Sequence, residues 1–365
     1  MQTPFPAPLN IDDWERDAAE RLSRMIFDYY QGGAEDETTV RENRAAWQRL
    51  SLRPRVLVDV TQRNLATTVL GQPISMPILT APCGFNALAH PEGEFAVARA
   101  TTAAHTIQVV STAATYSLEE VAAAVPEGIR WFQLYCYKDR GITKALVQRA
   151  AAAGYRALCL TVDAPFVGRR ERDIRNRFRL PPGLRWKNLE PYGFDRMEAS
   201  DDGSALAKYI ETIWDAGLTW DAVDWLRTLS PLPLVLKGVL TAEDARLAVE
   251  HGVAGIVVSN HGGRQLDGAI ATATALPEIA DVVTDRAELY VDGGIRRGTD
   301  VLKALALGAR AVLIGRPYLW GLAMDGEAGV SRVLAMLREE LSLSMALAGQ
   351  ADVAHVGRGL IYDRP

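Results

Sequence analysis

Residues 254–268 read AGIVVSNHGGRQLDG, and this stretch decides the fold that we predict. Its first part, Gly255–Val258, is uncharged and β-branched, which is typical of a short strand buried on both faces. His261 and Arg264 follow, separated by two glycines that allow a sharp turn close to a ligand. If the chain continued as a helical turn, both side chains would share one face and place a proton acceptor beside an anion-binding group. The alternative is a buried, hydrogen-bonded histidine with a surface arginine.

Length, charge and cysteine usage restrict the class of protein. The chain has 365 residues, a net charge of −5 and no basic run, which argues against nucleic-acid binding. No segment reaches the apolar length that spans a bilayer, and the Pro-rich start lacks a signal-peptide pattern. Cys83, Cys136 and Cys159 are scattered without metal-ligand spacing, as reduced core thiols are. We therefore expect a cytoplasmic protein that binds no metal, nucleic acid or membrane.

Short apolar runs alternate with alanine-rich amphipathic segments from residue 76 onward. The eight runs are Ile78–Ala81, Ile107–Val110, Trp131–Leu134, Ala157–Val162, Leu234–Leu236, Gly255–Val258, Leu289–Val291 and Ala311–Ile314. The helix-like segments between them include Glu92–Ala104, Ser117–Ala124, Ile142–Ala153, Ala242–His251 and Gly298–Leu307, and a last one is expected near Gly329–Leu347. Eight strand–helix units predict an α/β fold, the closed (β/α)₈ barrel, which reaches this length as a single domain.

Three parts of the chain are predicted. Residues 1–50 should form a helical segment packed on the barrel, residues 51–350 the barrel itself, and residues 351–365 a tail. The first part is expected to contain helices over Ile11–Tyr30 and about Glu35–Leu50. The connection after the fourth strand, about residues 166–230, is far longer than one helix requires. A connection of that length is typical of a lid or a binding loop.

The predicted carboxyl ends of the strands carry residues that are nearly all polar, charged or glycine. They are Pro82, Cys83, Gly84, Ser111, Gln133, Tyr135, Thr161, Asp163, Lys237, Ser259, His261, Arg264, Asp292, Gly293, Gly294, Ile295, Arg296, Gly315 and Arg316. In (β/α)₈ barrels the active site lies at this face. A ring of polar groups with no function would need many buried partners, so we expect these side chains to form a site.

The last two strand ends predict an anion site. DGGIR at residues 292–296, followed by Gly315 and Arg316, offers backbone N–H groups and two guanidinium groups on adjacent strands. This combination suits a phosphate but specifies no reaction.

Two strand-end residues have several interpretations. Lys237 could form a Schiff base, pair with a carboxylate or lie against an electron-rich ring. Asp163 could orient a histidine or cap a helix, and the motif alone favours the cap.

Taken together, the motifs resemble the FMN-dependent 2-hydroxy acid oxidases and dehydrogenases, and most closely the soluble lactate-oxidase-like members. The resemblance runs from Ile26 to about Gly349, and its most specific part is SNHGGRQLD at residues 259–267. The other matching motifs are DYY at 28–30, FQLY at 132–135, TVDAP at 161–165, LKG at 236–238 and DGGIRRG at 292–298.

The resemblance implies that FMN lies across the mouth of the barrel. The implied phosphate ligands are Gly293, Gly294, Arg296, Gly315 and Arg316. The rest of the implied cofactor site is Pro82, Cys83, Gly84, Ser111, Gln133, Tyr135, Thr161, Lys237, Ser259, Asp292 and Ile295. Lys237 would face the N1/O2 edge of the flavin, where a cation favours the anionic reduced form.

The resemblance also implies the catalytic residues. His261 would be the general base, Asp163 would stabilise its imidazolium form, and Tyr135 would hydrogen-bond the substrate near the reacting oxygen. Whether electrons leave as a hydride or through a carbanion stays open. The substrate carboxylate would bind Tyr29, Arg170 and Arg264, since guanidinium groups bind carboxylates with two hydrogen bonds.

One departure from the family bears on the substrate. Glycolate oxidases carry a tryptophan two residues after the serine of the second strand, whereas Ala113 stands there in this chain. The lost indole leaves room for a side chain larger than hydrogen, so we expect L-lactate first, with larger aliphatic or aromatic 2-hydroxy acids also accepted. One methylene changes binding by only about 1–3 kcal/mol, so the preference need not be sharp.

A second departure bears on the electron acceptor. Membrane-bound members carry an apolar insertion after the fourth strand, but this chain has charged residues there, at Arg185, Lys187, Glu190, Asp195, Arg196, Asp201 and Asp202. We therefore expect molecular oxygen to accept the electrons and form hydrogen peroxide. The alternatives are a dehydrogenase that uses a quinone or another carrier, a lactate 2-monooxygenase, and a flavin-binding sensor without turnover. The family implies a homotetramer.

Overall fold

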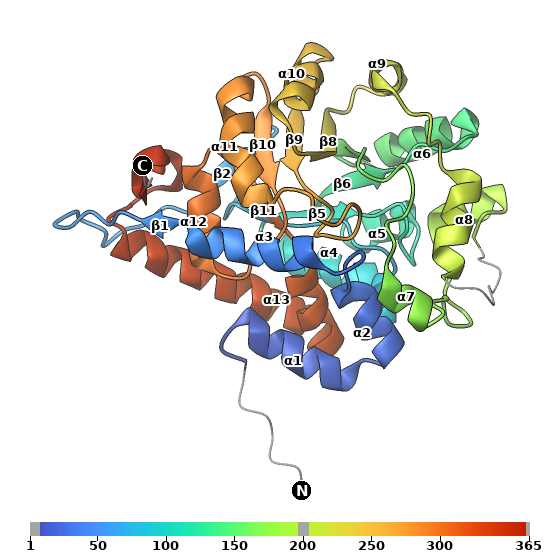
Figure 1. Ribbon diagram of the computed structural model, residues 1–365, viewed down its shortest axis with the longest axis horizontal. Helices are drawn as coiled ribbons and strands as arrows, with labels where there is room; N and C mark the ends of the chain where they lie inside the picture. Colours follow the sequence, from blue (N-terminus) through green and yellow to red (C-terminus); the bar gives the residue numbers. More distant parts are fainter. Residues whose placement is uncertain (1–7, 196–203, 363–365) are drawn as a thin grey trace, which may run out of the picture.

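Eight parallel strands form a closed barrel within residues 8–195 and 204–362, which are the residues that the structure, a computed structural model, describes (Figure 1). The strands are β4 (Ile78–Thr80), β5 (Ile107–Val110), β6 (Ile129–Leu134), β7 (Ala157–Thr161), β8 (Leu234–Val239), β9 (Gly255–Val258), β10 (Glu288–Val291) and β11 (Ala311–Ile314). They pair in chain order, and β11 closes on β4. The predicted (β/α)₈ barrel is confirmed.

The strands are mainly apolar because both of their faces are buried. In β9, Val257 belongs to the cluster inside the barrel, whereas Ile256 and Val258 belong to the cluster under the surrounding helices. Successive side chains of a strand point to opposite faces, and since both faces are packed, most strand positions carry an apolar side chain. The surrounding helices are α4 (Gly93–Ala103), α5 (Leu118–Ala124), α6 (Arg140–Ala152), α9 (Trp220–Leu229), α10 (Ala242–Glu250), α11 (Thr272–Val283), α12 (Gly298–Ala306) and α13 (Arg316–Leu347).

The amino-terminal segment differs from the prediction of one helix over Ile11–Tyr30. It forms α1 (Ile11–Arg21) and α2 (Arg24–Gln31), because Leu22 and Ser23 take extended backbone angles. The break lets α1 pack along α13 while α2 turns toward the mouth of the barrel (Figure 1). The next helix, α3 (Thr38–Arg49), begins three residues later than Glu35 because Glu35 and Glu37 have left-handed φ angles of 47° and 59°.

The long connection after β7 contains regular structure. It includes α7 (Glu171–Arg175), a 3₁₀ turn at Lys187–Tyr192 and α8 (Ala205–Ile213), and it leads into α9. Arg196, Asp201 and Asp202, on which part of the acceptor argument depends, lie outside the described residues.

The carboxyl-terminal part extends beyond the predicted helix at Gly329–Leu347. Helix α13 already begins at Arg316, and a kink at Asp325 and Gly326 divides it. Beyond it, β12 (Ile361–Tyr362) pairs antiparallel with β1 (Ser51–Leu52), and a hairpin of β2 (Thr67–Val69) and β3 (Gln72–Ile74) precedes the barrel. Among residues 8–195 and 204–362, no helix is long and apolar enough to cross a bilayer.

Candidate active site

A cavity at the carboxyl ends of the strands brings most of the predicted site residues together. Its lining includes Tyr29, Pro82, Cys83, Gly84, Ser111, Ala113, Tyr135, Arg170, Lys237, His261, Arg264, Asp292, Gly293, Gly294, Ile295, Arg296, Gly315 and Arg316. Four further predicted residues, Gln133, Thr161, Asp163 and Ser259, do not line this cavity but contact residues that do or each other. These residues are far apart in the sequence, and the closed barrel gathers them at one rim.

His261 and Asp163 form a buried pair at the ends of β9 and β7. His261 Nδ1 lies 2.9 Å from Asp163 Oδ1, which leaves Nε2 for another partner. The helix-cap interpretation of Asp163 is wrong, since the next helix, α7, begins only at Glu171. Burial lowers the pKa of His261 below 6.5, although the charge of Asp163 opposes this shift. The imidazole is therefore neutral at pH 7 and can accept a proton.

The chain beyond β9 does not continue as a helical turn. His261, Gly262 and Gly263 all have left-handed φ angles, of 57°, 65° and 76°. A Cβ on Gly263 would lie 2.7 Å from the backbone nitrogen of Val40, so only glycine fits this close approach to α3. His261 and Arg264 nevertheless both line the cavity, because the tight turn, and not helical spacing, directs them there.

Lys237 pairs with a carboxylate, which is one of its three predicted alternatives. Its Nζ lies 3.1 Å from Asp292 Oδ2 and 3.0 Å from Ser259 Oγ. Burial disfavours the ammonium ion, but the charges of Asp292 and Asp163 outweigh it and raise the pKa of Lys237. A protonated amine is not a nucleophile, so the site does not favour a Schiff base. Lys237 therefore presents a fixed positive charge to the cavity.

A row of polar side chains crosses β5, β6 and β7 at the base of the rim. Gln133 Nε2 donates to Thr161 Oγ1 at 3.0 Å, and Ser111 Oγ donates to Gln133 Oε1 at 3.2 Å. All three side chains are buried. Because each is fixed by its neighbour and by the sheet, the row offers a rigid polar edge for a bound ring.

Arg296 and Arg316 both line the cavity and form a partly buried cationic cluster. The Nε of Arg296 is buried without a hydrogen-bond partner among the described residues. Burial and the charges of Arg264 and Arg296 lower the pKa of Arg316 to about 9. Like charges held together in this way favour a bound anion. Gly294 has a φ of 82°, and a Cβ there would lie 2.2 Å from the Asn43 carbonyl oxygen, so the backbone can form this loop only with glycine.

Tyr29, Arg170 and Arg264 lie on the side of the cavity that faces the amino-terminal segment. The Tyr29 ring stacks on Phe178 with centroids 4.2 Å apart, and Arg264 Cζ lies 5.2 Å from the same ring. Burial raises the pKa of Tyr29 to about 12, so its phenol remains a hydrogen-bond donor. Arg170 Nε donates to the Arg264 carbonyl at 3.2 Å, which holds the two arginines close together.

Sequence reasoning missed the apolar wall of the cavity. Trp186, Leu206, Ile210 and Trp214 line it from the connection after β7. The Trp186 indole donates to the Thr112 carbonyl at 2.6 Å and therefore lies next to Ala113. Trp214 stacks on Tyr135 with centroids 3.9 Å apart. The richness of this connection in tryptophan was visible, but nothing in the sequence indicated which side chains would turn inward.

Comparison with known proteins assigns the family. A model of the FMN-dependent dehydrogenase family matches residues 18–363. The chain belongs to this family. Among its relatives, an L-lactate oxidase from Nostoc sp. is 54% identical over 99% of this chain and 100% of the relative. A glycolate oxidase from Spinacia oleracea is 52% identical over 96% of this chain and 95% of the relative.

Solved structures also resemble this chain over nearly its whole length. A mandelate oxidase with (S)-4-hydroxymandelic acid has a TM-score of 0.92 and 43% identity, covering 96% of this chain and 97% of that one. An active chimera of (S)-mandelate dehydrogenase, carrying a substitution, has a TM-score of 0.90 and 40% identity, covering 98% and 99%.

FMN, the cofactor of this family, suits the residues that line the cavity. The unpartnered Arg296 Nε and the crowded Arg316 cation match a phosphate group in charge and in hydrogen-bond donors. The Lys237 ammonium and the Gln133 row supply a cation and polar groups of the kind that bind the edge of a flavin. The cavity therefore has the anion site and the polar edge that the cofactor requires.

Proposed function

We propose that the protein oxidises L-2-hydroxy acids to 2-oxo acids with FMN, and that molecular oxygen accepts the electrons and becomes hydrogen peroxide. One observation carries this proposal: a neutral histidine, paired with a buried carboxylate at 2.9 Å, lines the same cavity as Arg170 and Arg264. A base beside two guanidinium groups suits a substrate with a carboxylate next to the carbon that loses hydrogen.

In this proposal His261 accepts a proton from the substrate at Nε2. Asp163 then stabilises the imidazolium ion, since interaction with His261 outweighs burial and lowers the pKa of the carboxyl group. Tyr135 donates a hydrogen bond near the reacting oxygen, because burial and the charge of Asp163 raise its pKa and keep the phenol protonated. FMN, when bound, accepts two electrons from the substrate and passes them to oxygen.

Arg170, Arg264 and Tyr29 bind the substrate carboxylate in this proposal. Burial and the charge of Arg264 lower the pKa of Arg170 to about 10, so a bound anion would relieve the repulsion between the two cations. The proposed phosphate ligands of FMN are Gly293, Gly294, Arg296, Gly315 and Arg316. Its ring would lie against Pro82, Cys83, Gly84, Ser111, Gln133, Tyr135, Thr161, Lys237, Ser259, Asp292 and Ile295.

L-Lactate is the proposed first substrate. Ala113 leaves the wall beside the substrate open, but Trp186 borders the same place, so the pocket has room for a methyl group and a limit on larger groups. The L-lactate oxidase from Nostoc sp. is 54% identical and the glycolate oxidase from Spinacia oleracea 52% identical, so the choice of lactate rests on the wall at Ala113 and not on the identity.

A flavin assay tests the proposal. The purified protein should show a bound-flavin spectrum, which L-lactate bleaches under argon and air restores with formation of hydrogen peroxide. Slow return of the colour in air would indicate another electron carrier, and acetate among the products would indicate a monooxygenase. If no 2-hydroxy acid of either hand bleached the flavin, the proposed activity would be wrong.

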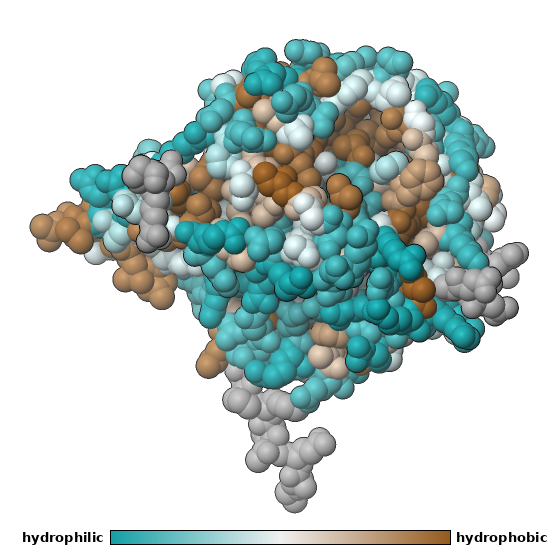
Figure 2. Space-filling model, viewed as in Figure 1, coloured by the Kyte–Doolittle hydropathy of each residue, from teal (hydrophilic) through white to brown (hydrophobic). Residues whose placement is uncertain are grey.

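We also propose a homotetramer. Val56 and Leu57 are 81% and 104% exposed on the loop after β1, and Leu343 and Leu347 are exposed near the carboxyl end of α13. Figure 2 shows hydrophobic atoms at the left edge of the molecule. The backbone bond from Arg55 to Ala348 joins these two segments. An apolar surface of this kind favours a protein partner, here a second copy. Leu57→Asp should reduce the mass measured by light scattering, and an unchanged mass would exclude this surface from the interface.

The cytoplasmic location and the division into residues 1–50, 51–350 and 351–365 stay predictions. Cell fractionation tests the location. Limited proteolysis tests the division, because cleavage should concentrate near residues 50 and 350 if the parts are separable.

A further inference from the structure

The carboxyl-terminal end of α2 holds two arginines of the proposed site at once. Arg264 NH1 donates to the carbonyls of Tyr29 at 2.6 Å and Gly32 at 2.9 Å. Arg316 donates to the carbonyls of Tyr30 and Gly32, both at 3.0 Å. The last carbonyls of a helix lack partners within the helix and form the negative end of its dipole, so they suit cations. The position of α2 therefore sets the distance between the arginine of the substrate side and the arginine of the phosphate side.

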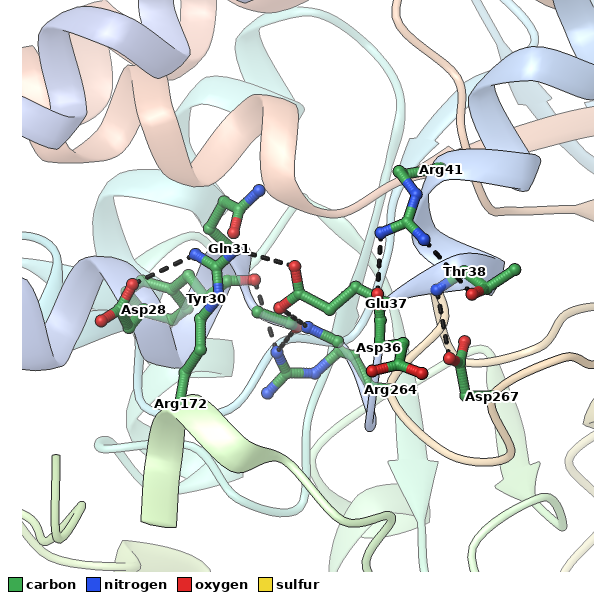
Figure 3. Close-up of polar contacts among 12 residues, drawn as sticks. Asp28, Tyr30, Gln31, Asp36, Glu37, Thr38, Arg41, Arg172, Arg264 and Asp267 are labelled. Atoms are coloured by element: carbon green, nitrogen blue, oxygen red, sulfur yellow. Dashed lines mark hydrogen bonds and ion pairs between the residues drawn. The ribbon is translucent and has the colours of Figure 1, made fainter. Parts of the chain in front are cut away.

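A set of ion pairs outside the cavity fixes this end of α2. Arg172 of α7 donates to Asp28 Oδ1 at 3.2 Å and to Glu37 Oε2 at 2.7 Å (Figure 3). Asn176 donates to the other oxygen of Asp28 at 2.8 Å, and the second oxygen of Glu37 accepts from the Gly33 backbone at 3.0 Å. We name Arg172, Asp28 and Glu37 the Arg172 clasp, because Arg172 joins the end of α2 to the turn before α3.

The clasp is sheltered from solvent. The Asp28, Glu37 and Arg172 side chains are only 4%, 18% and 30% exposed, so salt screens these pairs less than it screens pairs on the open surface. Burial disfavours ionisation of Asp28, but hydrogen bonds from Asn176, Arg24 and Arg172 outweigh it and lower its pKa. The Asp28 carboxylate thus stays charged at neutral pH, and its ion pair with Arg172 is maintained.

We propose that the Arg172 clasp positions Arg264 and Arg316 through the end of α2, and so couples binding of the substrate carboxylate to binding of the FMN phosphate. The clasp residues are absent from the lining of the cavity, so they act as positioning residues. Helix α7, which carries Arg172, follows directly on Arg170. The Glu35 backbone also donates to the Arg169 carbonyl at 2.8 Å. The clasp therefore connects Arg170, another proposed ligand of the substrate carboxylate, to the turn before α3. This inference rests on the proposed function.

Arg172→Ala in the flavin-loaded enzyme tests the proposal. It should raise the KM for L-lactate about fivefold while kcat stays within about twofold, the scale expected for partly sheltered ion pairs. It should also raise the Kd of FMN for the apoprotein, measured by the quenching of flavin fluorescence. Arg172→Lys should restore part of both affinities, since one ammonium group can reach one carboxylate but cannot bridge two.

Arg175→Ala is the matched control, because Arg175 is an exposed residue of the same short helix and pairs with partly buried Glu171. A purely structural role for Arg172 would lower the melting temperature but leave KM and the FMN Kd as in the control, and that result would overturn the proposal. A fall in kcat at constant KM would also overturn it. If Arg172→Ala does not fold, Glu37→Gln removes one charge and keeps an acceptor for Gly33, and it should shift both affinities in the same direction.

Turnover assays of the wild-type enzyme distinguish an error in the proposed role of the clasp from an error in the proposed function. If it turns over no 2-hydroxy acid, the function is wrong, and the FMN Kd of the Arg172 variants still reports on the clasp. If it oxidises lactate but the variants bind FMN and lactate as the control does, only the clasp is wrong.

Discussion

The rim of strand ends and the segments that surround it build the active site in different ways. At the rim, Lys237 lies within β8, and Asp163 and His261 come two and three residues after the ends of β7 and β9, so the hydrogen-bonded barrel fixes where each of them lies. Around the rim, Tyr29 and Trp186 come from α2 and from the connection after β7, and side-chain contacts hold them. The difference teaches that the sheet fixes the groups proposed for the chemistry, whereas the added segments shape the space for the substrate.

The largest effect should come from the rim. His261→Ala removes the proposed base and should lower kcat for L-lactate about 10⁴-fold, at the upper end for general-base catalysis. The flavin spectrum should remain, because the proposed FMN ligands are untouched. Stopped-flow absorbance under argon measures the bleaching rate directly. Bleaching at the wild-type rate would show that His261 is not the base. It would also contradict the view that the rim supplies the groups for the chemistry.

A pH profile tests the same pair. His261 must be neutral to act as a base, and burial lowers its pKa, so kcat/KM should begin to fall at a lower pH than it would with an ordinary imidazole as the base. Asp163→Asn removes a carboxylate that raises this pKa, so the acid limb should move to still lower pH. The same change should lower kcat roughly 10²-fold or more, because the imidazolium loses its partner. If the acid limb of the Asp163→Asn profile moved to higher pH, this account would be contradicted.

A smaller effect is expected from the surrounding segment. Trp186 is buried and lies beside Ala113, so Trp186→Leu should enlarge the pocket and raise the ratio of kcat/KM for mandelate to that for lactate about tenfold. The melting temperature should fall as well, since part of a buried indole is lost. Ala113→Trp is the converse variant and should lower the ratio. If neither variant moved the ratio, the connection after β7 would not set substrate size.

The predictions that failed concern contacts between side chains of distant segments, and not the pairing of the strands. Helix Ile11–Tyr30 was predicted as one element because apolar periodicity runs through it, but packing of α1 on α13 and of α2 toward the barrel mouth favours a break at Leu22 and Ser23. Asp163 looked like a helix cap because the sequence does not show that its partner, His261, lies 98 positions away. Both errors concern contacts between distant segments.

The sequence by itself determined the barrel and the identity of the strand-end groups. Runs such as Gly255–Val258 have the continuous apolar pattern that only a strand buried on both faces requires, and the residue after each run is read directly from the chain. Only the tertiary structure decided that Lys237 pairs with Asp292, that Trp186 borders Ala113 and that α2 holds Arg264 and Arg316. The physical reason is that backbone pairing and burial follow local periodicity, whereas these contacts depend on how segments that are tens to hundreds of residues apart pack against one another.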